Sequence, residues 1–118
     1  MVVDQTSGDP ADRIFHALAD GTRRDILTRA VGDGDSVSTL AQRYPMSFAA
    51  VQKHVAVLER AGLVTKERRG RARLVRTDID TVQRARMLLD GIEQQWRARI
   101  DRIDDLLATE QRNPGGKR

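Results

Sequence analysis

The chain has 118 residues, and its 21 Lys and Arg outnumber its 17 Asp and Glu, so that the net charge is +4. This length predicts one small domain, and a hydrophobic fraction of only 39% limits the core that one copy can bury. No apolar run approaches the ~18 residues that cross a membrane, and no signal peptide is visible. We therefore expect a cytoplasmic protein without a membrane partner.

The N-terminal part predicts two short helices after an irregular start. Residues 1–8 are polar and without periodicity, so we expect disorder there. Asp9 is a suitable cap for a first helix over about residues 10–18. Thr22 is expected to cap the second helix, and a glycine-rich loop follows at 32–34. The inward-facing positions of the two helices are predicted to be Ile14, Ala17, Leu18, Ile26, Leu27 and Ala30.

Residues 35–46 predict a third, short helix followed by a turn. Asp35 or Ser36 is expected to cap this helix. Pro45 cannot continue a helix, and it biases Tyr44 out of helical geometry, so the helix ends before them. The inward-facing positions of the helix are predicted to be Val37, Leu40 and Ala41.

The segment from Ser47 to Gly62 predicts a fourth helix with two different faces. Ser47 is a good cap, and Gly62 supplies the left-handed residue that ends many helices. One face is an apolar stripe of Val51, Val55 and Leu58. The opposite face is small or basic and has no acid; it consists of Ala49, Lys53, Ala56 and Arg60. Such a face can approach the floor of a DNA major groove, although the segment alone could equally be an ordinary surface helix.

The next residues, 63–77, predict a basic β-hairpin. Two β-prone runs flank Gly70, which suits the turn. Four arginines stand at its tip, namely Arg68, Arg69, Arg71 and Arg73. Residues 47–77 hold eight Lys and Arg against two Glu, a net +6, whereas the rest of the chain is −2. A merely soluble turn would not need charge of one sign, so the clustering indicates an anionic partner.

A long C-terminal helix is predicted from Thr77 and Asp78 to about Glu110. Its apolar positions recur every three or four residues from Val82 to Leu107. This stripe is longer than a small domain can cover. It could pack against the first two helices, but we favour an outer part that seals a two-fold dimer through the N- and C-terminal helices. The expected interface residues are Ile14, Leu89, Ile92, Trp96, Ile100, Ile103 and Leu107.

The order of these elements predicts a mainly α fold with a small β-hairpin: a winged helix-turn-helix with five helices plus a wing. We expect residues 9–111 to form this DNA-binding and dimerisation domain. Residues 112–118 are expected to form a flexible basic tail.

Two segments resemble signatures of the ArsR (ArsR/SmtB) family of bacterial transcriptional regulators. Residues 15–27 are similar to its LADxTRRxIL motif, and residues 47–64 to its SxxxVSxHLxxLxxAGLV motif. The resemblance covers roughly residues 10–110. Gln52 stands where the family usually has Ser, which leaves the base preference open. The resemblance implies a sequence-specific transcriptional regulator, most simply a homodimeric repressor, in some cases of its own gene, on a pseudo-palindromic operator in double-stranded DNA.

The metal chemistry of the family does not carry over to this sequence. Classical members place two thiols in a CVC segment, where this chain has Ser36-Val37-Ser38, and it contains no cysteine at all. A second family site uses carboxylates and histidines on the C-terminal helix, which here has Asp90 and Glu93 but no histidine. The chain therefore resembles the metal-independent, SdpR-like branch, and we predict no metal site and no cofactor. The sequence does not name a small-molecule effector.

The candidate DNA-binding residues lie on the fourth helix and the hairpin. They are Ser47, Phe48, Ala49, Gln52, Lys53, His54, Arg68, Arg69, Arg71 and Arg73.

Several of these residues have a second interpretation. Lys53 could read guanine or contact phosphate, and Gln52 could read adenine or be merely solvated. His54 could be a half-buried scaffold residue, a phosphate contact or a base reader. Phe48 could belong to the core or contact a thymine methyl, while Ser47 caps its helix and suits a phosphate. Outside this set, Arg23 and Arg24 are expected mainly to form structural ion pairs with Asp20 and Asp25.

Two other classes of protein compete with a DNA-binding regulator. An enzyme is disfavoured, because the sequence shows no nucleophile paired with a base, no metal cluster and no phosphate-cradling glycine loop. A winged-helix module for protein–protein assembly is the stronger alternative. The hairpin distinguishes a DNA-binding regulator from an assembly module, since an assembly module has no need of four arginines at the tip of its hairpin.

Overall fold

The computed structural model describes residues 8–112. The predicted disorder over residues 1–8 and the predicted tail over residues 112–118 fall outside the described residues except at their inner ends, where Gly8 is described and Arg112 is the last residue of a helix rather than part of the tail. The chain divides into two compact units, and the boundary falls between Ala85 and Arg86. We call residues 8–85 the winged unit and residues 86–112 the outer helix, and each is described by itself.

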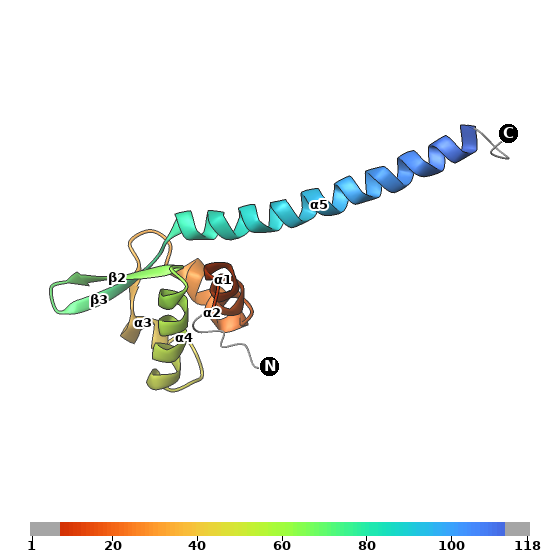
Figure 1. Ribbon diagram of the computed structural model, residues 1–118. Coiled ribbons are helices and arrows are strands. Elements are labelled where there is room, and N and C mark those ends of the chain that lie inside the picture. Colours follow the sequence, from red (N-terminus) through yellow and green to blue (C-terminus); the bar gives the residue numbers. More distant parts are fainter. Residues whose placement is uncertain (1–7, 113–118) are drawn as a thin grey trace. The chain divides into compact units, whose positions relative to one another are not determined.

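The winged unit contains four helices and a small sheet, followed by the first turns of a fifth helix (Figure 1). This confirms the predicted mainly α winged helix-turn-helix with five helices and a wing. The elements in chain order are α1 (Pro10–Leu18), α2 (Gly21–Arg29), β1 (Asp35–Ser36), α3 (Val37–Ala41), α4 (Phe48–Arg60), β2 (Val64–Arg69), β3 (Ala72–Thr77) and α5 (Ile79–Arg112).

Short polar side chains begin the helices by accepting hydrogen bonds from backbone N–H groups that have no partner within the helix. Asp9 does so for α1, Ser36 for α3, and Ser47 for α4 through a 3.1 Å bond from the Ala50 N–H, as the sequence predicts. The prediction for α2 was wrong. Its cap is Asp20, whose Oδ2 accepts from the Arg23 N–H at 3.1 Å, and Thr22 lies within the first turn.

The sheet has three antiparallel strands in the order β1-β3-β2, one more than the predicted hairpin. The additional strand, β1, pairs Asp35 with Val75 and Ser36 with Leu74. Gly34 makes this pairing possible. Its φ is +84°, and a Cβ there would lie 2.6 Å from the carbonyl oxygen of Val75. Two residues are too few to give a periodic signal, which is why the sequence did not predict this strand.

The core of the winged unit lies between the helices and the inner face of the sheet. The predicted stripe of α4 is fully covered there. Ile14 belongs to the same core and is only 1% exposed, so its assignment to a dimer interface was wrong. The buried apolar residues are Ile14, Ala17, Ile26, Leu27, Ala30, Leu40, Val51, Val55, Leu58, Leu63, Val64, Val75 and Ala85.

The junction between β3 and α5 is tied to the core by backbone and side-chain hydrogen bonds. The Thr77 N–H donates to the Ala30 carbonyl at 3.0 Å, and its hydroxyl donates to the Leu27 carbonyl at 2.7 Å. Asp78 then caps α5 by accepting from the N–H of Asp80 at 3.0 Å. The long helix therefore starts where the sequence predicts. Within residues 8–112, no helix is long and apolar enough to span a membrane.

Candidate nucleic-acid interface

The exposed face of α4 is held outward by its buried stripe. Because Val51, Val55 and Leu58 have no exposed surface, the helix cannot rotate without opening the core. Ala49, Gln52 and Lys53 are consequently exposed on the other side.

The first turn of α4 carries Ser47 and Phe48. Ser47 is exposed, and its hydroxyl caps the helix. The Phe48 side chain is 46% exposed, so this aromatic ring does not belong to the core. Of its two interpretations, the exposure therefore contradicts the core interpretation.

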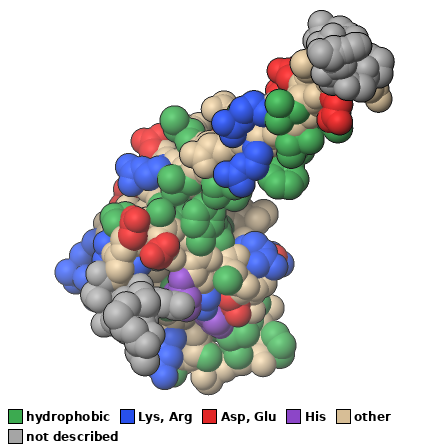
Figure 2. Space-filling model, turned by 45° about the vertical axis from the view of Figure 1, so that its right-hand side comes forward, with side chains coloured by type: hydrophobic (Ala, Val, Ile, Leu, Met, Phe, Trp, Pro, Cys, Tyr) green, Lys and Arg blue, Asp and Glu red, His purple; other side chains and the backbone are tan. Residues whose placement is uncertain are grey.

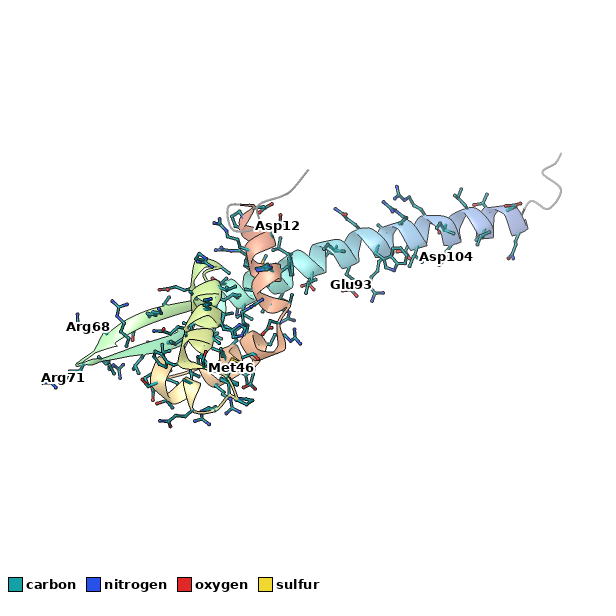
Figure 3. The ribbon with its side chains drawn as sticks, turned by 90° about the horizontal axis from the view of Figure 1, so that it is seen from below. Asp12, Met46, Arg68, Arg71, Glu93 and Asp104 are labelled. Carbon is teal, nitrogen blue, oxygen red and sulfur yellow. The ribbon has the colours of Figure 1, made fainter. Side chains whose placement is uncertain are left out.

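The β2–β3 hairpin forms the wing and concentrates positive charge at its end. Gly70 has a φ of +59° in the turn, as the sequence predicts. Arg68 lies directly opposite Arg73 in the strand register, an arrangement of like charges that destabilises a hairpin. Arg68 and Arg71 lie at the tip of the hairpin, away from the helices (Figure 3). The arginines at the tip of the wing therefore do not stabilise the hairpin through pairing with each other.

A groove of about 390 Å³ connects the wing with α3 and α4. The side chains of Lys66 and Arg73 both reach this groove, because alternate residues of a strand share one face of the hairpin. Lys66 also forms an ion pair, in which its Nζ lies 3.6 Å from Oε1 of Glu59. Arg71 and Arg73 form no ion pair within the described part of the chain. The groove is lined by Ser36, Val37, Ser38, Gln52, Lys66, Arg71, Ala72 and Arg73. It thus places a possible base-reading residue beside cations that are available to a phosphate.

Ser36 and Ser38, at the thiol positions of the family motif, lie on the wall of this groove. The Ser36 hydroxyl donates to Thr39 Oγ1 at 2.9 Å and also caps α3. Hydroxyls here can bind a phosphate oxygen but are poor ligands for soft metals. Among residues 8–112, no group of three or more His, Cys, Asp and Glu side chains could hold a metal ion.

His54 faces inward, toward α2, rather than toward the groove. Its Nδ1 lies 3.2 Å from Nη1 of Arg23 and 3.9 Å from Oδ2 of Asp20. A guanidinium can only donate, so Nδ1 of His54 is the acceptor in this contact. This geometry supports the scaffold interpretation of His54.

Arg23 and Arg24 bind the C-terminal end of α1 rather than the carboxylates that we expected. Arg23 donates from Nε to the Ala17 carbonyl at 2.7 Å and from Nη2 to the His16 carbonyl at 3.0 Å. Arg24 donates from Nη1 to the Leu18 carbonyl at 2.8 Å. Carbonyls in the last turn of a helix lack the usual partner four residues later within the helix, and positive charge there is favourable. The two arginines are structural, as predicted, but their partners were predicted wrongly.

A second set of polar contacts, which sequence reasoning missed, holds the turn before α4. The Tyr44 hydroxyl and the Arg29 Nε each donate to Oδ2 of Asp25 at 2.7 Å. Burial and then the hydrogen bond to this carboxylate raise the pKa of Tyr44 to about 12. The same two donors, Tyr44 first, lower the pKa of Asp25. In the sequence, the only indication of these contacts is an aromatic residue, Tyr44, directly before a proline.

Comparisons with known proteins agree with this geometry. A family described as a helix-turn-helix domain matches residues 18–67. The HTH-type transcriptional regulator Rv2034 of Mycobacterium tuberculosis is 42% identical over 67 residues, which are 57% of this chain and 63% of that protein. The match thus spans slightly less than two thirds of that relative's length.

Two solved structures are similar over more of the chain. An ArsR-like transcriptional regulator from Rhodococcus sp. RHA1 is 32% identical, with a TM-score of 0.74 over 82% of this chain and 92% of that one. An ArsR family transcriptional regulator, RHA00566, is 30% identical, with a TM-score of 0.67 over 75% of this chain and 98% of that one.

The likeness to these regulators is therefore one of sequence as well as fold. The chain belongs to the ArsR family of winged helix-turn-helix transcriptional regulators.

Proposed function

We propose that this regulator is a homodimeric repressor that binds a pseudo-palindromic operator in double-stranded DNA. In this proposal α4 enters the major groove, where Gln52 and Lys53 reach base edges and Phe48 contacts a thymine methyl. The wing arginines bind the adjacent phosphates. The protein acts in the cytoplasm and, in the simplest case, represses its own gene.

The observation that carries the proposal is the groove between α4 and the wing. Exposed Gln52 shares it with Arg71 and Arg73, and none of its lining side chains is acidic. A groove that combines a base-reading amide with unpaired cations suits a nucleic acid, because phosphates supply most of the affinity and base edges the specificity.

The homodimer is supported by the outer helix and by the match between two copies of α4 and a two-fold operator. Hydrophobic side chains are exposed along the outer helix, although a solvated helix normally keeps such residues isolated (Figure 2). A dimer also presents two α4 helices to one DNA duplex, which matches a two-fold operator.

We further propose that DNA binding does not depend on a metal. The support lies in the residue types, namely Ser36 and Ser38 at the thiol positions and a sequence without cysteine.

In vitro selection from a randomised duplex library tests the proposal directly. The expected product is an inverted repeat whose half-site centres lie about 10 base pairs apart or a multiple of that. Affinity for it should be the same with micromolar Zn²⁺ and with a chelator. Gln52→Ala should change base preference at particular positions, whereas Arg71→Ala should weaken all duplexes alike. If the selection enriches no duplex at all, the proposal is overturned.

A further inference from the structure

A second pocket, of about 350 Å³, lies in the winged unit and is lined mainly by apolar side chains of α2, of the start of α5 and of the segment between α4 and β2. Two of these side chains, Leu27 and Leu63, belong to the core. Three others leave apolar surface open to solvent, since Val31 is 53% exposed, Ile79 47% and Val82 36%. None of the candidate DNA-binding residues lines this pocket, which has the size of a small-molecule site.

The two hydroxyl groups that line the pocket are already engaged within the chain. The Thr77 hydroxyl donates to the Leu27 carbonyl at 2.7 Å, and the Thr28 hydroxyl donates to the Arg24 carbonyl at 3.3 Å. The wall therefore offers little to a polar ligand group, which would lose its hydrogen bonds to water without replacement. The part of a ligand that fills this space has to be hydrocarbon.

Among the described residues that line the pocket, Arg24 alone carries a charge. Its Nη1 donates to the Leu18 carbonyl at 2.8 Å, and it forms no ion pair within residues 8–112. A guanidinium has five N–H donors in a planar fork, so most of the Arg24 donors remain for an external acceptor. A carboxylate matches such a fork, because its two oxygens can accept two parallel hydrogen bonds.

We infer that this pocket binds a small aliphatic carboxylic acid, with the hydrocarbon chain against Leu27, Leu63 and Ile79 and the carboxylate on Arg24. A cavity of about 150 Å³ is enough for a benzene ring, so this pocket has room for a chain of about eight carbon atoms. The site is built from residues outside the candidate DNA-binding set. It therefore adds a second binding function to the one proposed above.

Calorimetric titration of the full chain with octanoate, in the absence of DNA, tests the inference. We expect saturable binding of one octanoate per chain with a Kd of about 1 mM or below. Octanol has the same chain without the charge, and octylamine has the opposite charge. Each should bind at least about tenfold more weakly, because neither can accept a charge-assisted hydrogen bond pair from the guanidinium. Octanol that binds as tightly as octanoate would overturn the inference. Because no DNA is present, that result would leave the proposed repressor untouched.

A substitution at Arg24 tests which residue recognises the carboxylate. Arg24→Gln keeps a donor for the Leu18 carbonyl, so it should weaken octanoate binding about tenfold and leave octanol binding unchanged within about twofold. Arg24→Lys keeps the charge and should retain most of the preference for octanoate. Arg43→Gln removes the same charge from an exposed position outside the pocket and is the matched control. Equal losses in Arg24→Gln and Arg43→Gln would overturn the assignment to Arg24.

A substitution at Val31 tests where the hydrocarbon chain lies. Val31→Asp places an anion on an exposed part of the wall, so it should abolish octanoate binding while the buried core stays intact. Unaltered octanoate binding by this variant would overturn the location. Sedimentation of the same variant examines a second copy as the occupant. Dimerisation weakened by Val31→Asp, together with no octanoate binding by the natural protein, would assign the pocket to a second copy and overturn the inference.

Discussion

Arg23 and His54, which are 31 residues apart in the sequence, join the N-terminal helices to the helix that carries the candidate base-reading residues. The guanidinium reaches two carbonyls of α1 and the ring nitrogen of His54 at once. One side chain therefore fixes the position of α4 relative to α1 and α2. The helix that carries the candidate DNA-binding residues is in this way tied by hydrogen bonds to α1 and α2.

Arg23→Ala should lower the free energy of unfolding by about 2–4 kcal/mol, because three hydrogen bonds from a charged donor are removed. His54→Ala alone should cost about 1 kcal/mol. In a double-mutant cycle measured by urea unfolding, the two should couple by at least about 0.5 kcal/mol. Arg24→Ala is the matched control, since Arg24 binds the same helix end without touching His54. Equal coupling of His54 to both arginines would refute the specific contact.

Gly34→Ala should destabilise the protein more than Gly32→Ala. Both glycines have left-handed φ values, +84° and +88°, so both substitutions carry the same backbone strain. Only at position 34 does the new Cβ meet the β3 backbone, whereas position 32 has nothing within 4 Å. The difference in the free energy of unfolding should be about 1–3 kcal/mol. If the two variants have the same denaturant midpoint, the β1–β3 pairing can shift to accommodate the new Cβ at little cost in stability.

Tyr44→Phe should change how stability depends on acid. The pKa of Asp25 is lowered in the folded protein, first by the Tyr44 hydroxyl, so its contribution is present at neutral pH and lost as pH falls through the carboxylate range. The deficit of the variant should therefore be largest near neutral pH and smaller near about pH 3. Denaturant unfolding at both pH values measures it. A deficit independent of pH would contradict this account.

The same hydrogen bond should be visible in the alkaline range. The pKa of Tyr44 is raised from 10.0 to about 12, so the stability from its neutral form persists below the ordinary value and is lost as pH rises through that interval. Tyr44 is the only tyrosine, so tyrosinate absorbance reports it alone. The midpoint should lie above that of the denatured chain, and Asp25→Asn should lower it. A midpoint equal to that of the denatured chain would show that the hydroxyl is solvated.

The wing arginines should determine the salt dependence of DNA binding. A dimer that neutralises about eight phosphates has a log–log slope near −7. Arg71→Ala or Arg73→Ala should make the slope less negative by about 0.9 for each phosphate that is no longer neutralised, or about 1.8 for the dimer. Arg102→Ala on the outer helix removes the same charge and should leave the slope unchanged. Identical slopes for all three variants would place the phosphate-binding cations elsewhere.

The sequence by itself determined the local elements and their order. The stripe of α4 and the turn glycine Gly70 were predictable, because side-chain periodicity and a left-handed φ are properties of neighbouring residues. The same holds for Asp78 at the start of α5. The basic composition of the candidate DNA-binding face was also predictable from the sequence, since positive charge accumulates in residues 47–77.

Only the tertiary structure decided which residues meet across the fold. It moved Ile14 from an expected interface into the core, added β1, and turned His54 away from the groove. These outcomes depend on packing between residues far apart in the chain, whose geometry no local pattern encodes. An apolar residue looks the same in the sequence whether its own core or a second copy covers it. A histidine beside an apolar stripe likewise gives no sign of the arginine that packing will bring to it.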